Sequence, residues 1–286
     1  MSQILLSRRR FITAGILTAA AVSIPFADAE ATNRVRVSWV PLPIPGLPAS
    51  LSGTTIAQVS DLHLFESEPH AAAQHALEAL HRERPDLLVL TGDQWDHPHG
   101  ARALEQWLRA LPRGLPVVAV MGNHEYSAGA SPDQATRVHA RGGAELLVNR
   151  SMTLRLRGGR IQLAGLDDMR YGRPDAAAAA RGLDPDVPQI WLLHEPGQLD
   201  RTVWPEGPPP MLTLSGHTHG GQIRCPGVPP ILPQGSGRYV SGLYRTRRGT
   251  FYVSRGVGTS APRMRFLCPA ELPIFELRPA PTEAVA

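Results

Sequence analysis

The sequence contains no lysine, so all 29 of its basic residues are arginines. This absence excludes a Walker A phosphate-binding loop and a Schiff-base enzyme, because each requires a lysine amine. A Gly-x-Ser-x-Gly motif is also missing, which argues against a serine hydrolase with a nucleophile elbow. The arginines are scattered, and we interpret the pair Arg247 and Arg248 as solvated surface rather than as a phosphate clamp.

Net charge is also low. The whole chain carries a formal charge of +4, and the chain without residues 1–29 has 26 arginines against 24 acidic residues, which leaves +2. Proteins that bind nucleic acid usually carry a concentrated basic patch. We therefore expect no nucleic-acid partner.

The sequence has no hydrophobic run long enough to span a membrane, since the longest, from Phe11 to Phe26, has 16 residues where a spanning helix needs ~20. This run follows Ser7-Arg8-Arg9-Arg10-Phe11-Ile12, which resembles a twin-arginine export signal, and precedes the small-residue site Ala27-Asp28-Ala29. We interpret residues 1–29 as a cleaved signal that engages the twin-arginine translocation machinery, and we expect the protein in the periplasm or cell envelope. The alternatives are an ordinary secretory signal and an uncleaved leader that anchors the protein to the membrane.

Cysteine is scarce, with Cys225 and Cys268 as its two occurrences. An oxidising compartment would permit a disulfide between them. Two unpaired thiols, one of them buried, are an equal alternative.

The remaining chain has the length of one large α/β domain. Residues 30–53 are interpreted as a first strand, near Val35–Val40, followed by a Pro-rich loop from Pro41 to Pro48 that belongs to the same domain. Residues 54–279 form the main domain, and residues 280–286 are expected to be a disordered tail.

Five short apolar runs each end in a polar cluster, which is typical of strands in a largely parallel sheet. The runs are Ile56–Ser60, Leu87–Leu90, Val117–Val120, Ile190–Leu193 and Met211–Leu214. Helices are predicted at residues 69–84, 101–110 and 131–142. Ligands bind beyond the carboxyl ends of such strands, so the five clusters are predicted to meet at one edge of the sheet. Later runs, at Met152–Leu156, Arg160–Ala164, Tyr239–Arg245, Thr250–Ser254 and Ile274–Leu277, are predicted to form a second sheet.

The polar clusters supply a set of ligands suited to two divalent metal ions. The set comprises Asp61, His63, Asp93, Asn123, His124, His194, His217 and His219. Residues two apart in an extended segment face the same way, so Asp61 and His63, or His217 and His219, can each present two ligands to one side. Two divalent ions carry +4 and the two aspartates neutralise half of it, so the centre would attract a phosphate ester and acidify a bound water. Imidazole-rich ligation favours manganese, iron or zinc over magnesium.

These motifs resemble, in order and spacing, the signature of the calcineurin-like metallophosphoesterases. They are Asp61-x-His63, Gly92-Asp93-x-x-Asp96, Gly122-Asn123-His124-Glu125, His194 and Gly216-His217-x-His219. Two longer runs, Gly216–Arg224 and Val253–Ser260, resemble the exported bacterial, YkuE-like subgroup. The resemblance implies an α/β fold in which two mixed β-sheets are flanked by helices in four layers.

The resemblance also implies a role for each site residue. Asp61, His63, Asp93 and His219 would hold one metal. Asp93, Asn123, His194 and His217 would hold the other, with Asp93 bridging the two. His124 would contact the phosphate and assist the leaving group, and Asp96 would orient a histidine.

The function predicted from these observations is a binuclear, metal-dependent phosphoesterase that hydrolyses a phosphomonoester or phosphodiester by attack of metal-bound hydroxide. A lipid-linked or cell-wall-linked phosphoester is one candidate substrate. One alternative function is a lipid phosphoester hydrolase similar to UDP-2,3-diacylglucosamine pyrophosphatases, which export disfavours because nucleotide-activated lipids lie on the cytoplasmic side. The other is a non-catalytic, metal-containing binding protein of the cell envelope, which the complete ligand set disfavours.

Overall fold

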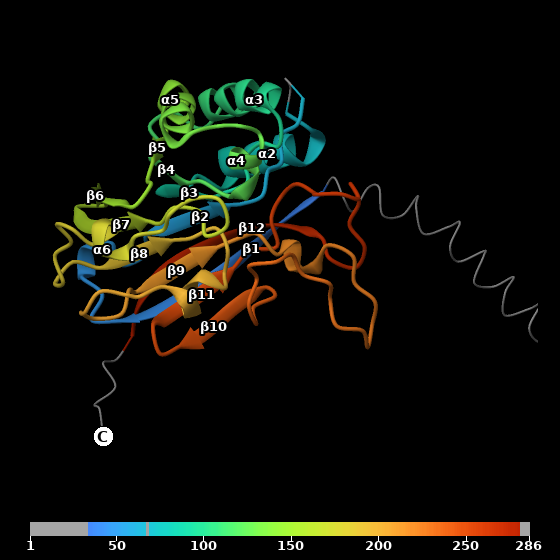
Figure 1. Cartoon of the computed structure of the whole chain (residues 1–286). Helices are drawn as coiled ribbons and strands as arrows, with labels where there is room; N and C mark the ends of the chain where they lie inside the picture. The colour runs from blue at the N-terminus through green and yellow to red at the C-terminus, as the bar shows by residue number, and fades with distance from the viewer. Residues whose placement is uncertain (1–33, 67–68, 281–286) are drawn as a thin grey trace, which may run out of the picture.

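The computed structural model describes residues 34–66 and 69–280 (Figure 1). The predicted leader and residues 281–286 of the predicted tail lie outside these ranges. Within them, no helix combines the length and the apolar character needed to cross a bilayer.

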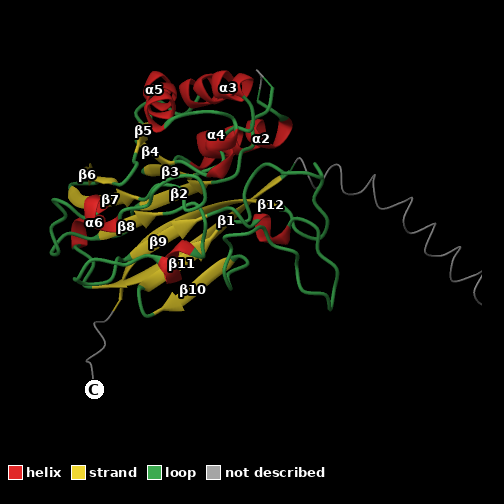
Figure 2. Cartoon of the chain, viewed as in Figure 1, coloured by secondary structure: helices red, strands yellow, loops and turns green. Residues whose placement is uncertain are grey.

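Two six-stranded β-sheets lie at the centre of the molecule (Figure 2). The first, in the order β1-β12-β2-β3-β4-β5, comprises β1 (Val35–Pro45), β12 (Ala270–Ala280), β2 (Thr55–Val59), β3 (Leu87–Thr91), β4 (Val117–Val120) and β5 (Glu145–Leu146). The second, in the order β10-β11-β9-β8-β7-β6, comprises β10 (Gly242–Thr246), β11 (Gly249–Val253), β9 (Leu212–Ser215), β8 (Gln189–Leu192), β7 (Gly159–Gly165) and β6 (Arg150–Leu156). Each sheet contains parallel and antiparallel pairs, so both are mixed.

Helices cover the outer faces of the two sheets. Those on the first sheet are α2 (Ala71–Glu83), α3 (Pro98–Arg109) and α5 (Pro132–Gly142), which lie together on one side of the molecule in Figure 1. Those packed on the second sheet are the short α6 (Ala176–Ala179) and α7 (Gln198–Arg201). The remaining short elements are α4 (Asn123–Ser127), η1 (Ala49–Leu51) and η2 (His219–Gly221). The four-layer α/β sandwich expected from the sequence is therefore confirmed.

The alternation of side chains along the central strands explains this layering. In β3, Leu87 and Val89 pack between the two sheets, whereas Leu88 and Leu90 pack under the helices. All four are buried, because a strand of this kind is covered on both faces.

The distribution of strands between the sheets differs from the prediction. Strands β8 and β9 lie in the second sheet, although their apolar sequences suggested membership of the first, and β12 joins the first sheet between β1 and β2. The physical reason is that both sheets contribute to a shared core, so strands of either sheet need the same apolar residues. Composition thus identifies a buried strand without identifying its neighbours.

The Pro-rich stretch is a further correction, since residues up to Pro45 continue β1 instead of forming a loop. Among the described residues, β1 lies at the edge of its sheet and pairs with β12 alone. Pro41, Pro43 and Pro45 alternate along it, so the positions that lack an N–H recur on one side of the strand. An edge strand tolerates proline on the side that has no partner.

Candidate metal centre

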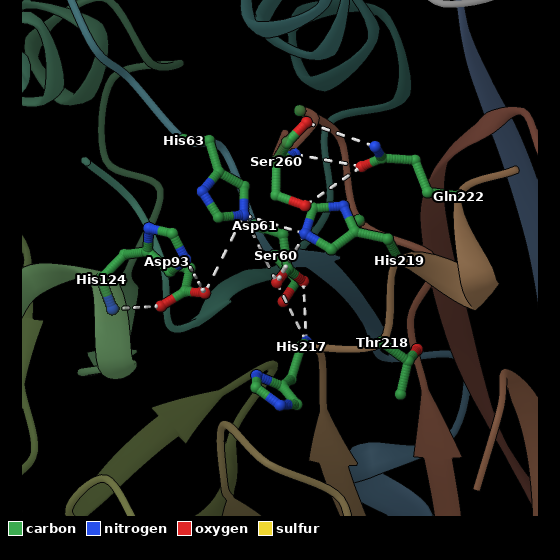
Figure 3. A network of polar contacts seen from close by, with 12 residues as sticks. Ser60, Asp61, His63, Asp93, His124, His217, Thr218, His219, Gln222 and Ser260 are labelled. Atoms are coloured by element: carbon green, nitrogen blue, oxygen red, sulfur yellow. Dashed lines mark hydrogen bonds and ion pairs between the residues drawn. The ribbon is translucent and has the colours of Figure 1, made fainter. Parts of the chain in front are cut away.

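The loops that follow β2, β3, β4, β8 and β9 converge where both sheets contribute. Figure 3 shows the side chains of Asp61, His63, Asp93, His124, His217 and His219 gathered there. Three overlapping groups of side chains bring their ligand atoms within 4.8 Å of one another: Asp61, His63 and His219; Asp93, His194 and His217; and His63, Asp93 and His124. All of these residues except His124 are buried. The predicted convergence therefore occurs, but between two sheets and not at the edge of one.

The first group has the geometry of a cage open to a cation. Nε2 of His63 lies 2.9 Å from Nε2 of His219, and the latter lies 3.6 Å from Oδ1 of Asp61. Burial lowers the pKa of His219, and the neighbouring His63 lowers it further. This imidazole is therefore neutral at pH 7. Neutral imidazole nitrogens and a carboxylate oxygen that face a common point are the ligands that transition metals and zinc prefer.

The second group contains the Asp93 carboxylate, which also lies near His63 of the first group. Oδ2 of Asp93 lies 3.1 Å from Nε2 of His194 and 3.9 Å from Nε2 of His63. Its other oxygen accepts the backbone N–H of His124 at 2.8 Å, at the start of α4. Burial would raise the pKa of Asp93, but His194 and the other histidines outweigh it and hold that pKa well below its usual range. Asp93 is thus an anion placed between the two groups.

Asn123 lines the same cavity as Asp93, and its amide oxygen is buried without a hydrogen-bond partner among the described residues. An unpaired buried oxygen costs roughly 1–3 kcal/mol. A cation in the second group would use it, so the residues present fit a metal.

Hydrogen bonds on the outer side of the rings fix which nitrogen faces inward. His194 Nδ1 donates to the carbonyl of Thr91 at 2.8 Å, and His217 Nε2 donates to the carbonyl of Gln234 at 2.9 Å. The remaining nitrogens of these two rings lie 3.1 Å apart inside the cage. Metal-binding histidines typically have such outer partners, because they set the tautomer and the ring orientation.

The backbone conformation of the candidate ligands corrects the expectation that the pairs Asp61/His63 and His217/His219 lie in extended segments. Asp61, His63, His217 and His219 have φ values of 53°, 49°, 72° and 49°, and Asp93 has 53°. These values lie in the left-handed region, where a non-glycine residue costs on the order of 1–3 kcal/mol. The pairs face one cage because each of these residues turns the chain, and not because a strand alternates.

Close packing of backbone against carboxylates holds these turns. A Cβ atom at Gly122 would collide with Oδ1 of Asp93, and one at Gly216 would collide with Asp61. Glycine is therefore required at both positions by space.

Asp96 links the cage to the cavity. Its Oδ1 accepts hydrogen bonds from Nδ1 of His63 at 2.6 Å and from Nδ1 of His124 at 2.9 Å. Burial would raise the pKa of Asp96, but the two histidines lower it to about 2. Burial would lower the pKa of His124, yet Asp96 and Asp93 raise it to about 9. His124, whose side chain is 33% exposed, therefore presents a protonated ring to the cavity.

Glu125 has a role that the sequence analysis did not assign. Its buried carboxyl group accepts four backbone N–H groups, those of Asp93, Gln94, Trp95 and Gly122. It therefore ties the loop after β3 to the loop after β4. Its position next to His124 in the motif was the available signal.

Arg265 is the second residue that sequence reasoning missed. Its buried guanidinium donates to five backbone carbonyls, those of His219, Arg255, Gly256, Gly258 and Cys268. It also lies 3.4 Å from Nδ1 of His219. The two cysteines are unpaired, and Cys268 donates to the His219 carbonyl at 3.2 Å. Both buried side chains thus brace His219, and no spacing in the sequence indicated this.

A cavity of about 560 Å³ opens from the centre, lined at its polar end by Asp93, Asn123, His124, His217 and His219. Arg170 also lines it. Asp167 and Asp168 accept backbone N–H groups of their own loop, including that of Arg170. They contribute no ligand atom to the three groups described above.

The sequence of this chain is similar to those of known phosphoesterases. Residues 54–221 match the family described as calcineurin-like phosphoesterase. The chain is 33% identical over 238 residues to the uncharacterized metallophosphoesterase YkuE of Bacillus subtilis (strain 168), covering 81% of this chain and 82% of that protein. It is 30% identical over 225 residues to the phosphodiesterase YaeI of Escherichia coli (strain K12), covering 77% and 80%. The solved structure of TT1561 of Thermus thermophilus aligns with a TM-score of 0.45 at 14% identity, over 72% of this chain and 91% of that one.

Proposed function

Because the chain belongs to the calcineurin-like phosphoesterase family, we propose that it is a binuclear, metal-dependent hydrolase of phosphomonoesters or phosphodiesters. The observation that supports this proposal is the presence of two fully buried ligand groups, one of which contains Asp93 at 3.9 Å from His63 of the other. A single structural ion would need only one of them.

The residues divide between two ions. Asp61, His63 and His219 would hold the first, and Asn123, His194 and His217 the second, with Asp93 contributing to both. Manganese, iron or zinc fits this mixture of imidazole and carboxylate. When bound, the ions would supply positive charge at the phosphate and activate a water molecule.

His124 would assist departure of the ester oxygen. Its Nδ1 donates to Asp96, so a proton on Nε2 is free to pass to the leaving group. The ring is placed for this because it lines the cavity beside Asp93. Asp96 acts through His124 and His63, and is therefore a positioning residue.

The proposal also includes export of the protein from the cytoplasm. The twin-arginine sequence in residues 1–29 supports transport of a folded protein to the periplasm or cell envelope, with a membrane anchor if the leader is retained. A protein exported in the folded state can receive its metals before it leaves the cytoplasm.

Elemental analysis and activity on one sample test the proposal. Protein purified from its own compartment is expected to contain about two equivalents of metal and to hydrolyse bis(4-nitrophenyl) phosphate. Asp93→Ala and His217→Ala should each reduce turnover by at least about 100-fold, exceeding the typical loss of an outer partner. Asp133→Asn, an exposed residue of α5, is the matched control. Near-normal turnover in both site variants, with unchanged circular dichroism, would refute the proposal.

A further inference from the structure

The cavity beside the metal centre changes character away from the ligands. One part of the lining carries Asp93 and the imidazoles of His124, His217 and His219. Another is an aliphatic wall, defined here by Ile223, Val228, Pro229, Ile231, Leu232 and Pro262. The wall and the ligands line one continuous space of about 560 Å³. That is the size of a site for a whole small molecule, much more than a phosphate group alone requires.

Several side chains of the wall are exposed to solvent although they are apolar. Ile231 is 91% exposed, Val228 63% and Ile223 38%. Isolated exposed aliphatic residues are ordinary, but three that border a single cavity next to a reactive centre form a contiguous apolar surface. Such a surface binds an apolar group most favourably.

Two uncharged polar residues that line the cavity, Gln222 and Thr218, have their side-chain hydrogen-bonding groups engaged within the protein. The amide of Gln222 donates to the carbonyls of Ser260 and Pro262, and its oxygen accepts the N–H of Ser260 (Figure 3). The hydroxyl of Thr218 donates to the carbonyl of Val240. Recognition of a nucleobase or a sugar would need unoccupied groups of this kind.

The described residues lining the cavity also include no phenylalanine, tyrosine or tryptophan. Stacking on such rings is the usual way to bind a base. The one arginine among them, Arg170, can contact a phosphate oxygen. The lining therefore favours a phosphate attached to an aliphatic group over a nucleotide.

We propose that the aliphatic wall binds a hydrocarbon chain carried by the phosphate, so that the enzyme acts on phosphoesters of lipid-type alcohols. This inference rests on the proposed phosphoesterase function. We identify the occupant as a hydrocarbon chain because the wall and the candidate metal ligands line the same cavity. A chain that contacts the wall can therefore belong to the same molecule as a phosphate at the ligands. Val228 and Ile231 would contact the chain where it leaves the cavity.

A series of 4-nitrophenyl phosphodiesters with methyl, butyl or octyl as the second ester group tests the proposal. Release of nitrophenolate is followed below the concentration at which the octyl ester forms micelles. Each methylene covered by the wall should raise kcat/KM by about 2- to 4-fold, until the wall is filled. The octyl-to-methyl ratio of kcat/KM is the quantity compared between variants.

The double variant Val228→Ser, Ile231→Ser is expected to lower this ratio by about 10-fold. Both side chains are exposed, so the variant should fold. The matched control is Val203→Ser, a residue that is 90% exposed and lies outside this cavity, and it should keep the wild-type ratio.

The outcomes separate the two proposals. Failure of the metal-loaded protein to hydrolyse any ester, methyl included, would remove the phosphoesterase function itself. Hydrolysis of the methyl ester with no gain from longer chains would leave that function standing and overturn the aliphatic site. A preference for nucleotide esters, or a double variant that changes only the oligomeric state, would overturn it as well.

Discussion

Oδ1 of Asp96 accepts a hydrogen bond from Nδ1 of His63 at 2.6 Å, on the side of the ring opposite to the nitrogen that faces His219. This contact decides which nitrogen of His63 is available to a metal. The same oxygen accepts a hydrogen bond from His124, so one carboxylate orients a candidate metal ligand and a cavity residue together.

Asp96→Asn should therefore weaken metal binding without unfolding the protein. Loss of an outer partner typically lowers metal affinity or activity by roughly 10–100-fold, and an amide can also offer the wrong group to both rings. Competition with a chelator measures the affinity, and thermal unfolding of the metal-free protein provides the control. An unchanged affinity, with activity also retained, would show that His63 is oriented by other contacts.

Arg265 is predicted to stabilise the fold as well as the site. Arg265→Met would remove the guanidinium donor from five buried carbonyls, of which that of His219 keeps the hydrogen bond from Cys268. We expect a loss of roughly 3 kcal/mol in the free energy of unfolding, with weaker metal binding in the fraction that folds. Urea denaturation measures the first and chelator competition the second. Arg113→Met, in an exposed turn, is the control and should change neither. Wild-type values for Arg265→Met would show that solvent or the backbone replaces the guanidinium.

The sequence predicted the elements better than their arrangement. The runs at Val117–Val120 and Leu87–Leu90 were recognisable because apolar segments of strand length end in turn-forming polar residues. The sheet to which β8 and β9 belong could not be recognised from the sequence, since strand pairing depends on contacts between distant segments. The left-handed backbone at Asp61 was also invisible, because surrounding packing imposes it against local preference.

The same distinction applies to the candidate site. The ligands could be proposed because several residue types that bind metals recur in short, ordered motifs. Arg265 could not, since a single arginine among 29 carries no signal until the fold places it behind His219. His139 is a further example, since nothing in its spacing along the helix indicates burial and it is fully buried. The burial of His139 is determined by residues that pack against it from other parts of the fold, and not by its spacing in the sequence.

Stability should depend on pH through His139. Burial lowers its pKa to about 4, and its Nδ1 donates to the carbonyl of Ala135 at 2.8 Å, whereas its Nε2 has no partner among the described residues. The pKa of His139 in the folded state lies below the unfolded value of 6.5. The free energy of unfolding is therefore at its full value above about pH 6.5 and decreases as the pH falls towards 4. The loss is on the order of 3 kcal/mol.

His139→Phe keeps a ring beside Trp95 and removes the titration. Urea denaturation of both proteins at about pH 7.5 and about pH 4.5 should show the wild type losing more stability than the variant. Equal losses in the two proteins would show that His139 binds a proton as readily in the folded state as in the unfolded state.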